Sequence, residues 1–130
     1  MPLNKLLILM LVLVAWSISY AQAAELQVVD GVITSAIKDQ APVDKIETYR
    51  ADFGKLYCFT RILGAEGETE VTHVWYYQNN ELARVTLPVK SADWRTYSSK
   101  RFLPQWAGQW RVVVLDAEGS EIAVIPFSLE

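Results

Sequence analysis

The chain has 130 residues, with 12 lysines and arginines against 15 aspartates and glutamates, and a formal net charge of -3 at pH 7. This length accommodates one domain, and the acidic balance argues against a nucleic-acid-binding protein. Cys58 is the only cysteine, so an intramolecular disulfide and a cysteine metal cluster are both excluded. His73 is the only histidine, so a zinc site would need carboxylates for its other ligands. We therefore expect no metal and no cofactor.

The N-terminal residues have the three zones of a secretory signal peptide. Lys5 and the amino terminus are positive, Leu6 to Trp16 form an apolar run, and Ala21-Gln22-Ala23 has the small-x-small form of a cleavage site. The apolar run is shorter than the roughly 20 residues that cross a bilayer. The sequence thus predicts a signal peptide at residues 1–23, a mature domain at residues 24–130 and no stable membrane span after cleavage. The alternative is an uncleaved anchor. Export without disulfides favours the bacterial periplasm, or secretion.

Beyond the signal, short β-branched and aromatic runs alternate with turn residues, and no segment keeps a helical period. Seven strands are predicted, at Gln27–Ile37, Lys55–Leu63, Glu70–Gln78, Glu81–Val89, Trp94–Phe102, Gln109–Asp116 and Ser120–Leu129. The polar connection Lys38–Gly54 has room for one helical turn. Strands of this length joined by tight turns predict an all-β fold, a single antiparallel β-sandwich of Ig-like or fibronectin-like architecture.

Three turns have suitable chemistry. Gly64-Ala65-Glu66-Gly67 and Asn79-Asn80 offer residues that tolerate positive φ, and Asp116-Ala117-Glu118-Gly119 fits a type I turn. If the first turn closes a two-residue hairpin, Cys58 lies opposite His73. A hairpin at Asn79-Asn80 places Trp75 opposite Arg84, in a cation–π contact that we interpret as structural.

Several segments resemble DUF2914, a bacterial family of unknown function. They are Ala41–Asp44, Leu56–Ile62, Gly64–Gly67, Val71–Trp75 (VTHVW), Trp94–Lys100 (WRTYSSK) and Gly108–Val112. The most specific are VTHVW and WRTYSSK. The resemblance covers nearly all of the mature chain, and it implies a compact, mostly β module of envelope-associated proteins. It brings no catalytic residues.

A Cys58–His73 pair could form a thiolate nucleophile, which makes a small thiol-dependent enzyme one hypothesis. A cysteine in an apolar strand is more often an inert small hydrophobic residue. In that interpretation, which we favour, His73 has a structural role and fastens a neighbouring loop by a hydrogen bond.

A basic and aromatic stretch runs from Trp94 to Arg111 and contains no Asp or Glu. Strand alternation places Arg95, Tyr97 and Arg101 on one face, and Trp106 follows Pro104 in a turn where we expect it to be exposed. Such side chains suit a protein partner or an anionic glycan. The alternative is that the tryptophans are core and the arginines protect a sheet edge. For Trp94 and Trp110 we favour the core.

These observations predict an exported, non-catalytic binding module. Its proposed binding residues are Arg95, Tyr97, Arg101 and Trp106. Residues with expected structural roles are His73, Trp75, Arg84, Trp94 and Trp110. The partner would be an envelope protein or glycan and not a nucleic acid, with the oligomeric state left open. The alternatives are the thiol enzyme and a purely structural spacer.

Overall fold

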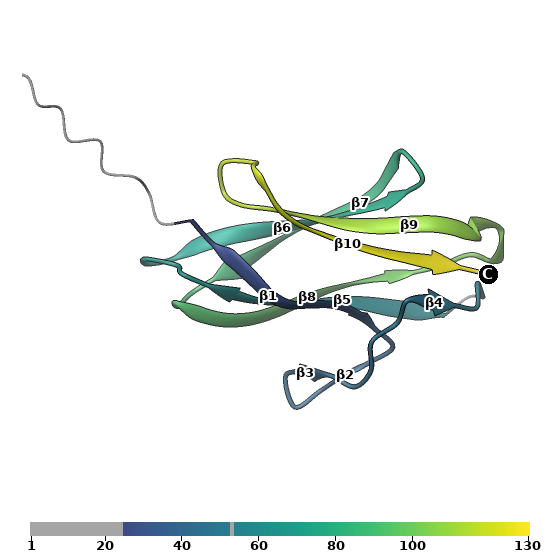
Figure 1. The fold of residues 1–130 in the computed structure, drawn as a ribbon, viewed down its shortest axis with the longest axis horizontal. Helices are drawn as coiled ribbons and strands as arrows, with labels where there is room; N and C mark the ends of the chain where they lie inside the picture. Colours follow the sequence, from purple (N-terminus) through teal and green to yellow (C-terminus); the bar gives the residue numbers. More distant parts are fainter. Residues whose placement is uncertain (1–24, 53) are drawn as a thin grey trace, which may run out of the picture.

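The computed structural model describes residues 25–52 and 54–130, which fold almost entirely as β-strands (Figure 1). The strands of this part of the chain are β1 (Gln27–Thr34), β2 (Ile37–Lys38), β3 (Ala41–Pro42), β4 (Thr48–Tyr49), β5 (Lys55–Leu63), β6 (Thr69–Tyr77), β7 (Asn80–Val89), β8 (Asp93–Arg101), β9 (Gly108–Leu115) and β10 (Glu121–Leu129). A short 3-10 turn, η1 (Pro104–Trp106), precedes β9. The predicted signal peptide lies outside the described residues.

The seven longer strands are those predicted from the sequence, and the all-β fold is confirmed. Three strands of two residues each, β2, β3 and β4, bring the total to ten and occupy the connection in which a helical turn had room. That expectation is wrong for the described residues of this segment. Asp39 and Gln40 have φ values of 52° and 59°. Two successive residues with positive φ close a tight hairpin, which here joins β2 to β3.

Two sheets form the layers of the sandwich (Figure 1). One has the strand order β1-β5-β8 and the other the order β4-β10-β9-β6-β7. The small β2–β3 hairpin projects on the side of the three-stranded sheet. All pairs of long strands are antiparallel, as predicted, but the short β4 runs parallel to the end of β10. The predicted Ig-like or fibronectin-like sandwich is therefore correct, with one parallel pair at its edge.

The segment from Gly64 to Gly67 does not close a hairpin within one sheet. It carries the chain from β5 in the three-stranded sheet to β6 in the other sheet. The Gly64 N–H donates to the Ala92 carbonyl at 2.9 Å, which extends the β5–β8 pairing instead. The predicted Cys58–His73 register is wrong for this reason, and Cys58 pairs with Ser98 of β8. Glycine-containing turns occur both in hairpins within one sheet and in connections between two sheets, so the turn residues alone do not distinguish the two.

The β6–β7 hairpin forms one residue earlier than predicted. Its loop is Gln78-Asn79, since Tyr77 pairs with Asn80 and Gln78 has φ 54°. A register shift between Trp75 and Tyr76 then sets Trp75 opposite Ala83, so the predicted contact between Trp75 and Arg84 is wrong. A one-residue shift moves every side chain to the opposite face. Arg84 lies on the exposed face and forms an ion pair with Glu81 at 2.6 Å.

The turn after β9 follows its prediction. The Gly119 N–H donates to the Asp116 carbonyl at 3.1 Å, and Gly119 has φ 83°. The Asp116 carboxylate also accepts the Ser120 N–H at 2.8 Å. Aspartate at the first position thus satisfies backbone donors of its own turn.

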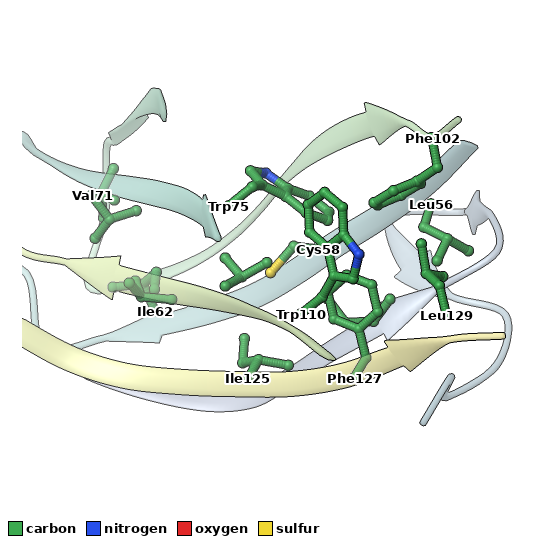
Figure 2. Packing of buried hydrophobic residues seen from close by; sticks show 14 of the residues in the cluster. Leu56, Cys58, Ile62, Val71, Trp75, Phe102, Trp110, Ile125, Phe127 and Leu129 are labelled. Atoms are coloured by element: carbon green, nitrogen blue, oxygen red, sulfur yellow. The ribbon is translucent and has the colours of Figure 1, made fainter. Parts of the chain in front are cut away.

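Aromatic rings fill one half of the space between the sheets (Figure 2). Trp75 is fully buried and meets Phe102 and Phe127 edge-on, each at 6.1 Å between ring centroids. Trp110, which is 2% exposed, stacks on Phe127 at 5.9 Å. Burial of such rings and their edge-to-face contacts stabilise the sandwich. Trp94 is half-buried and packs against the buried hydrophobic core.

Candidate binding face

The outward side chains of two paired strands form the candidate site, which we call the β5–β8 face. Its members are Lys55, Tyr57, Phe59 and Arg61 of β5, and Arg95, Tyr97, Ser99 and Arg101 of β8. Strand alternation sends the residues between them toward the core. The register sets Lys55 opposite Arg101, Phe59 opposite Tyr97, and Arg61 opposite Arg95. Cationic pairs thus lie at both ends of the face, with aromatic rings between them.

Phe59 is unusual because it points outward and yet is only 3% exposed. It pairs with Val32 on one side and Tyr97 on the other. It also lines a hollow together with Ala41 and Pro42 of the β2–β3 hairpin. The hairpin therefore covers part of the face, while Tyr97 remains 49% exposed. Tyr97 also meets Tyr57 edge-on at 5.9 Å.

The charges on the face are unequally satisfied. Arg61 donates two hydrogen bonds to Asp93, at 2.9 and 2.7 Å. These bonds lower the pKa of Asp93 below its usual range and raise the pKa of Arg61. Among the described residues, none accepts a hydrogen bond from Arg95 or forms a salt bridge with it. Arg95 also lies directly opposite Arg61, and like charges in this position repel each other. An anion bound to the Arg95 guanidinium would accept its hydrogen bonds and reduce this repulsion.

A groove of ≈ 610 Å³ opens along this part of the face. It is lined by Gln40, Phe59, Ser91, Asp93, Trp94, Arg95 and Tyr97. A second hollow of ≈ 280 Å³ shares Phe59 and Arg95 with it and continues beneath the β2–β3 hairpin. A guanidinium beside an exposed aromatic ring suits a ligand that combines a carboxylate or phosphate with an apolar surface.

The structure brings together three of the four proposed binding residues. Arg95 and Tyr97 line the groove, and Arg101 lies on the same face of β8. Trp106 lies apart, because its ring packs on Trp110 at 6.0 Å and lies under the Lys100 Nζ at 4.4 Å. It is half-buried, which differs from the exposure that we expected.

Sequence reasoning missed the half of the face that β5 supplies. Lys55, Tyr57, Phe59 and Arg61 alternate along that strand, so their shared face was visible in the sequence. The missing information was the pairing of β5 with β8, since the predicted hairpin paired β5 with β6. Without that pairing, the two sets of cations and aromatics do not meet.

A second polar group lies inside the sandwich and joins its two sheets. His73 of β6 is fully buried, with Nε2 3.0 Å from the Thr60 hydroxyl and Nδ1 2.7 Å from the Ser98 hydroxyl. The Trp75 indole N–H also donates to Ser98 Oγ, at 3.1 Å. Burial lowers the pKa of His73 to about 4, so the ring is neutral at pH 7. His73 thus has the expected structural role, but it fastens strands of the opposite sheet, whereas we expected it to fasten a loop.

Cys58 lies in the same interior but does not form a catalytic pair with His73. Its side chain is fully buried, and burial raises the pKa of the thiol far above its ordinary value. Both ring nitrogens of His73 instead contact hydroxyl groups. A reactive cysteine needs access and a stabilised thiolate, and the environment of Cys58 provides neither.

The described residues were also compared with the requirements of a metal site and of a membrane-spanning helix. Within residues 25–52 and 54–130, no three His, Cys, Asp or Glu side chains gather closely enough to hold a metal ion. In the same part of the chain, no helix has both the length and the apolar character needed to cross a bilayer.

The fold and the face define a small β-sandwich module with an exposed basic and aromatic surface. Its residues 68–129 match the profile of DUF2914, described as a protein of unknown function. The match confirms the resemblance seen in VTHVW and WRTYSSK and covers β6 to β10. The other resembling segments, before residue 68, lie outside it.

No curated protein matches the chain significantly. Among solved structures, the Pseudomonas fluorescens alkylpurine DNA glycosylase AlkC, bound to DNA containing an abasic site analog, is similar with a TM-score of 0.50 and 11% identity. The match covers 82% of this chain but only 31% of AlkC, and it shows similarity of fold alone. The CARDB domain of a Pyrococcus furiosus protein, in complex with di-metal ions, has a TM-score of 0.49 at 14% identity, covering 85% of this chain and 97% of that domain.

Proposed function

We propose that this protein is a non-catalytic binding module of the bacterial envelope, and that it holds an anionic partner on its β5–β8 face. The observation that carries the proposal is the unpaired Arg95 guanidinium beside the exposed Tyr97 ring, in a groove of ≈ 610 Å³. Arginine next to an aromatic ring is the combination that dominates many recognition surfaces.

The charge distribution supports an anionic partner. The chain as a whole has a formal net charge of -3, yet Lys55, Arg61, Arg95 and Arg101 gather on two adjacent strands. The Asp93 carboxylate forms both of its hydrogen bonds with Arg61. A local field of one sign accelerates the approach of an oppositely charged partner and aligns it.

The location follows from the predicted export signal. We propose cleavage after Ala23 and a periplasmic or secreted mature protein. Cell fractionation with N-terminal sequencing tests this, and a mature chain beginning at Ala24 is expected. Recovery of the uncleaved chain in the cytoplasm would contradict it.

Binding is tested by retention on immobilised polygalacturonate, an anionic glycan, and on an immobilised glutamate-rich polypeptide, each eluted with rising salt. Arg95→Gln is expected to elute at lower salt than the wild type from at least one matrix. Arg84→Gln is the matched control, because it removes the same charge from the exposed face of the other sheet. Equal elution of the two variants from both matrices would refute the proposal.

Asp93→Asn provides a test in the opposite direction. It removes the carboxylate that holds Arg61 at 2.7 Å and leaves that guanidinium available. We expect this variant to elute at higher salt than the wild type on the matrix that binds. Unchanged elution would show that the anion does not reach this part of the face.

A further inference from the structure

We infer that the partner adds a strand to the free edge of β8, as an extended acidic polypeptide segment whose carboxylates pair with Arg95 and its neighbours. This inference rests on the proposed function and specifies its ligand and its mode of binding. The observations that carry it are the hydrogen-bonding direction of the β8 backbone, the position of β8 in its sheet, and the charge of the β5–β8 face.

The backbone direction follows from two hydrogen bonds at the ends of the β5–β8 ladder. Phe102 N–H donates to Gly54 O, and Gly64 N–H donates to Ala92 O, both at 2.9 Å. Both pairs continue the regular register of β5 with β8. In an antiparallel ladder, hydrogen-bonded pairs recur at every second residue. The even-numbered residues of β8 therefore bond to β5, and the odd-numbered residues direct their N–H and C=O groups away from it.

Those outward backbone groups face no other strand in the described part of the chain. β8 is the last strand of the order β1-β5-β8. The outward groups belong to Arg95, Tyr97 and Ser99, whose side chains are the ones on the β5–β8 face. An unpaired edge of this kind is a template for strand addition. Backbone donors and recognition side chains thus come from the same three residues.

An added antiparallel strand would meet these residues in hydrogen-bonded pairs. Its side chains opposite Arg95, Tyr97 and Ser99 would share the β5–β8 face, about 5 Å from theirs. A carboxylate opposite Arg95 gives a charge-assisted hydrogen bond. The groove next to Tyr97 and Phe59 offers space for a neighbouring side chain.

Charge favours an acidic partner over a second copy of this chain. The face carries the cations Lys55, Arg61, Arg95 and Arg101, and the carboxylates of Asp93 and Asp30 lie beside Arg61. Cations thus outnumber these carboxylates, so two such faces at one edge would repel. An anionic glycan would satisfy Arg95, but it has no regular series of backbone amides to match the odd-numbered groups of β8. An extended acidic polypeptide matches both features.

The probe is a labelled nine-residue peptide in which glutamate alternates with threonine, measured by fluorescence anisotropy with the purified chain. N-methylation of the glutamates is expected to weaken binding at least about tenfold, because their N–H groups point to β8 when their side chains lie on the face. N-methylation of the threonines should leave the affinity unchanged. If the two modified peptides bind equally, the inference is wrong.

A protein variant tests the same edge from the other side. Ser99→Pro removes an outward N–H without removing a ladder bond to β5, and proline is tolerated in this position of an edge strand. It should weaken binding of the unmodified peptide at least about tenfold. The N-methylated peptides keep the test independent of any effect of Ser99→Pro on folding.

Amide hydrogen exchange followed by nuclear magnetic resonance separates the outcomes. With peptide, the amides of Arg95, Tyr97 and Ser99 should become protected. Arg95-dependent retention on polygalacturonate, without peptide binding, would overturn the inference and leave the proposed function intact. Absence of retention on both matrices of the preceding section would remove the proposed function as well. Protection that rises with protein concentration alone would identify a second copy as the added strand and also overturn the inference.

Discussion

His73 of β6 and Ser98 of β8 belong to opposite sheets, and His73 Nδ1 lies 2.7 Å from Ser98 Oγ inside the sandwich. Ser98 Oγ also accepts the Trp75 indole N–H at 3.1 Å. The described residues contain no buried side-chain nitrogen or oxygen without a hydrogen-bond partner. One hydroxyl therefore satisfies two polar groups of the facing strand and sets the position of one sheet on the other.

Ser98→Ala should be strongly destabilising because it leaves the Trp75 N–H and His73 Nδ1 without a partner in the core. We expect the free energy of unfolding to fall by roughly 2 to 4 kcal/mol. Ser99→Ala is the matched control, since its side chain points to the other face and is half-exposed; it should change stability by no more than about 0.5 kcal/mol. Urea unfolding monitored by tryptophan fluorescence measures both. Similar losses would contradict the role of the network.

Acid should destabilise the fold through His73. Its pKa is about 4 in the folded protein, against an ordinary 6.5, so the unfolded chain binds more protons between these values. The stabilisation is complete above pH 6.5 and is lost as the pH falls toward 4, by at most about 1.4 kcal/mol per pH unit. Because His73 is the only histidine, His73→Gln should be less sensitive to pH over this range. Equal pH dependence in urea unfolding would refute the prediction.

The Cys58 thiol should not react in the folded protein. It is fully buried, and its raised pKa leaves almost no thiolate at neutral pH. With Ellman's reagent we expect reaction only at the rate of unfolding, and complete reaction in denaturant. Free cysteine under the same conditions is the reference. Rapid modification of the native protein would reopen the thiol-enzyme hypothesis.

Gln78→Gly should stabilise the β6–β7 hairpin. Gln78 holds a φ of 54°, in the left-handed region that favours glycine. We expect a gain of roughly 0.5 to 1 kcal/mol in the free energy of unfolding. Asn79→Gly changes the other loop residue, which has no positive φ, and should bring no gain. Thermal unfolding compares the two variants, and equal effects would show that the backbone conformation is not the cause.

The positions of the long strands could be predicted because β-branched and aromatic residues recur between strong turn residues. Which strands pair with one another was predicted less well. The turn from Gly64 to Gly67 has the composition of a hairpin but crosses between sheets, so β5 was paired with the wrong strand. The error at Trp75 and Arg84 has two sources. Gln78 takes a conformation that a glutamine rarely adopts, which moves the loop, and the register shifts again between Trp75 and Tyr76.

The candidate site was predicted in part for the same reason. Arg95, Tyr97 and Arg101 lie on one face because alternation along a single strand is a local property. The contribution of Lys55 and Phe59 depends on which strand lies next to β8, and the covering of Phe59 depends on the β2–β3 hairpin. A two-residue strand is stabilised mainly by its tertiary surroundings, so composition gives little signal for it.

The alternation of β8 separates two tasks within one strand. Side chains at its odd-numbered positions can change without altering the ladder to β5 or the interior, while Ser98 and the other even-numbered residues hold the architecture. Under the proposed function, substitutions at positions 95, 97, 99 and 101 would change the ligand preference while the scaffold is retained. The same property makes this strand a suitable place to randomise when engineering the domain as an affinity reagent.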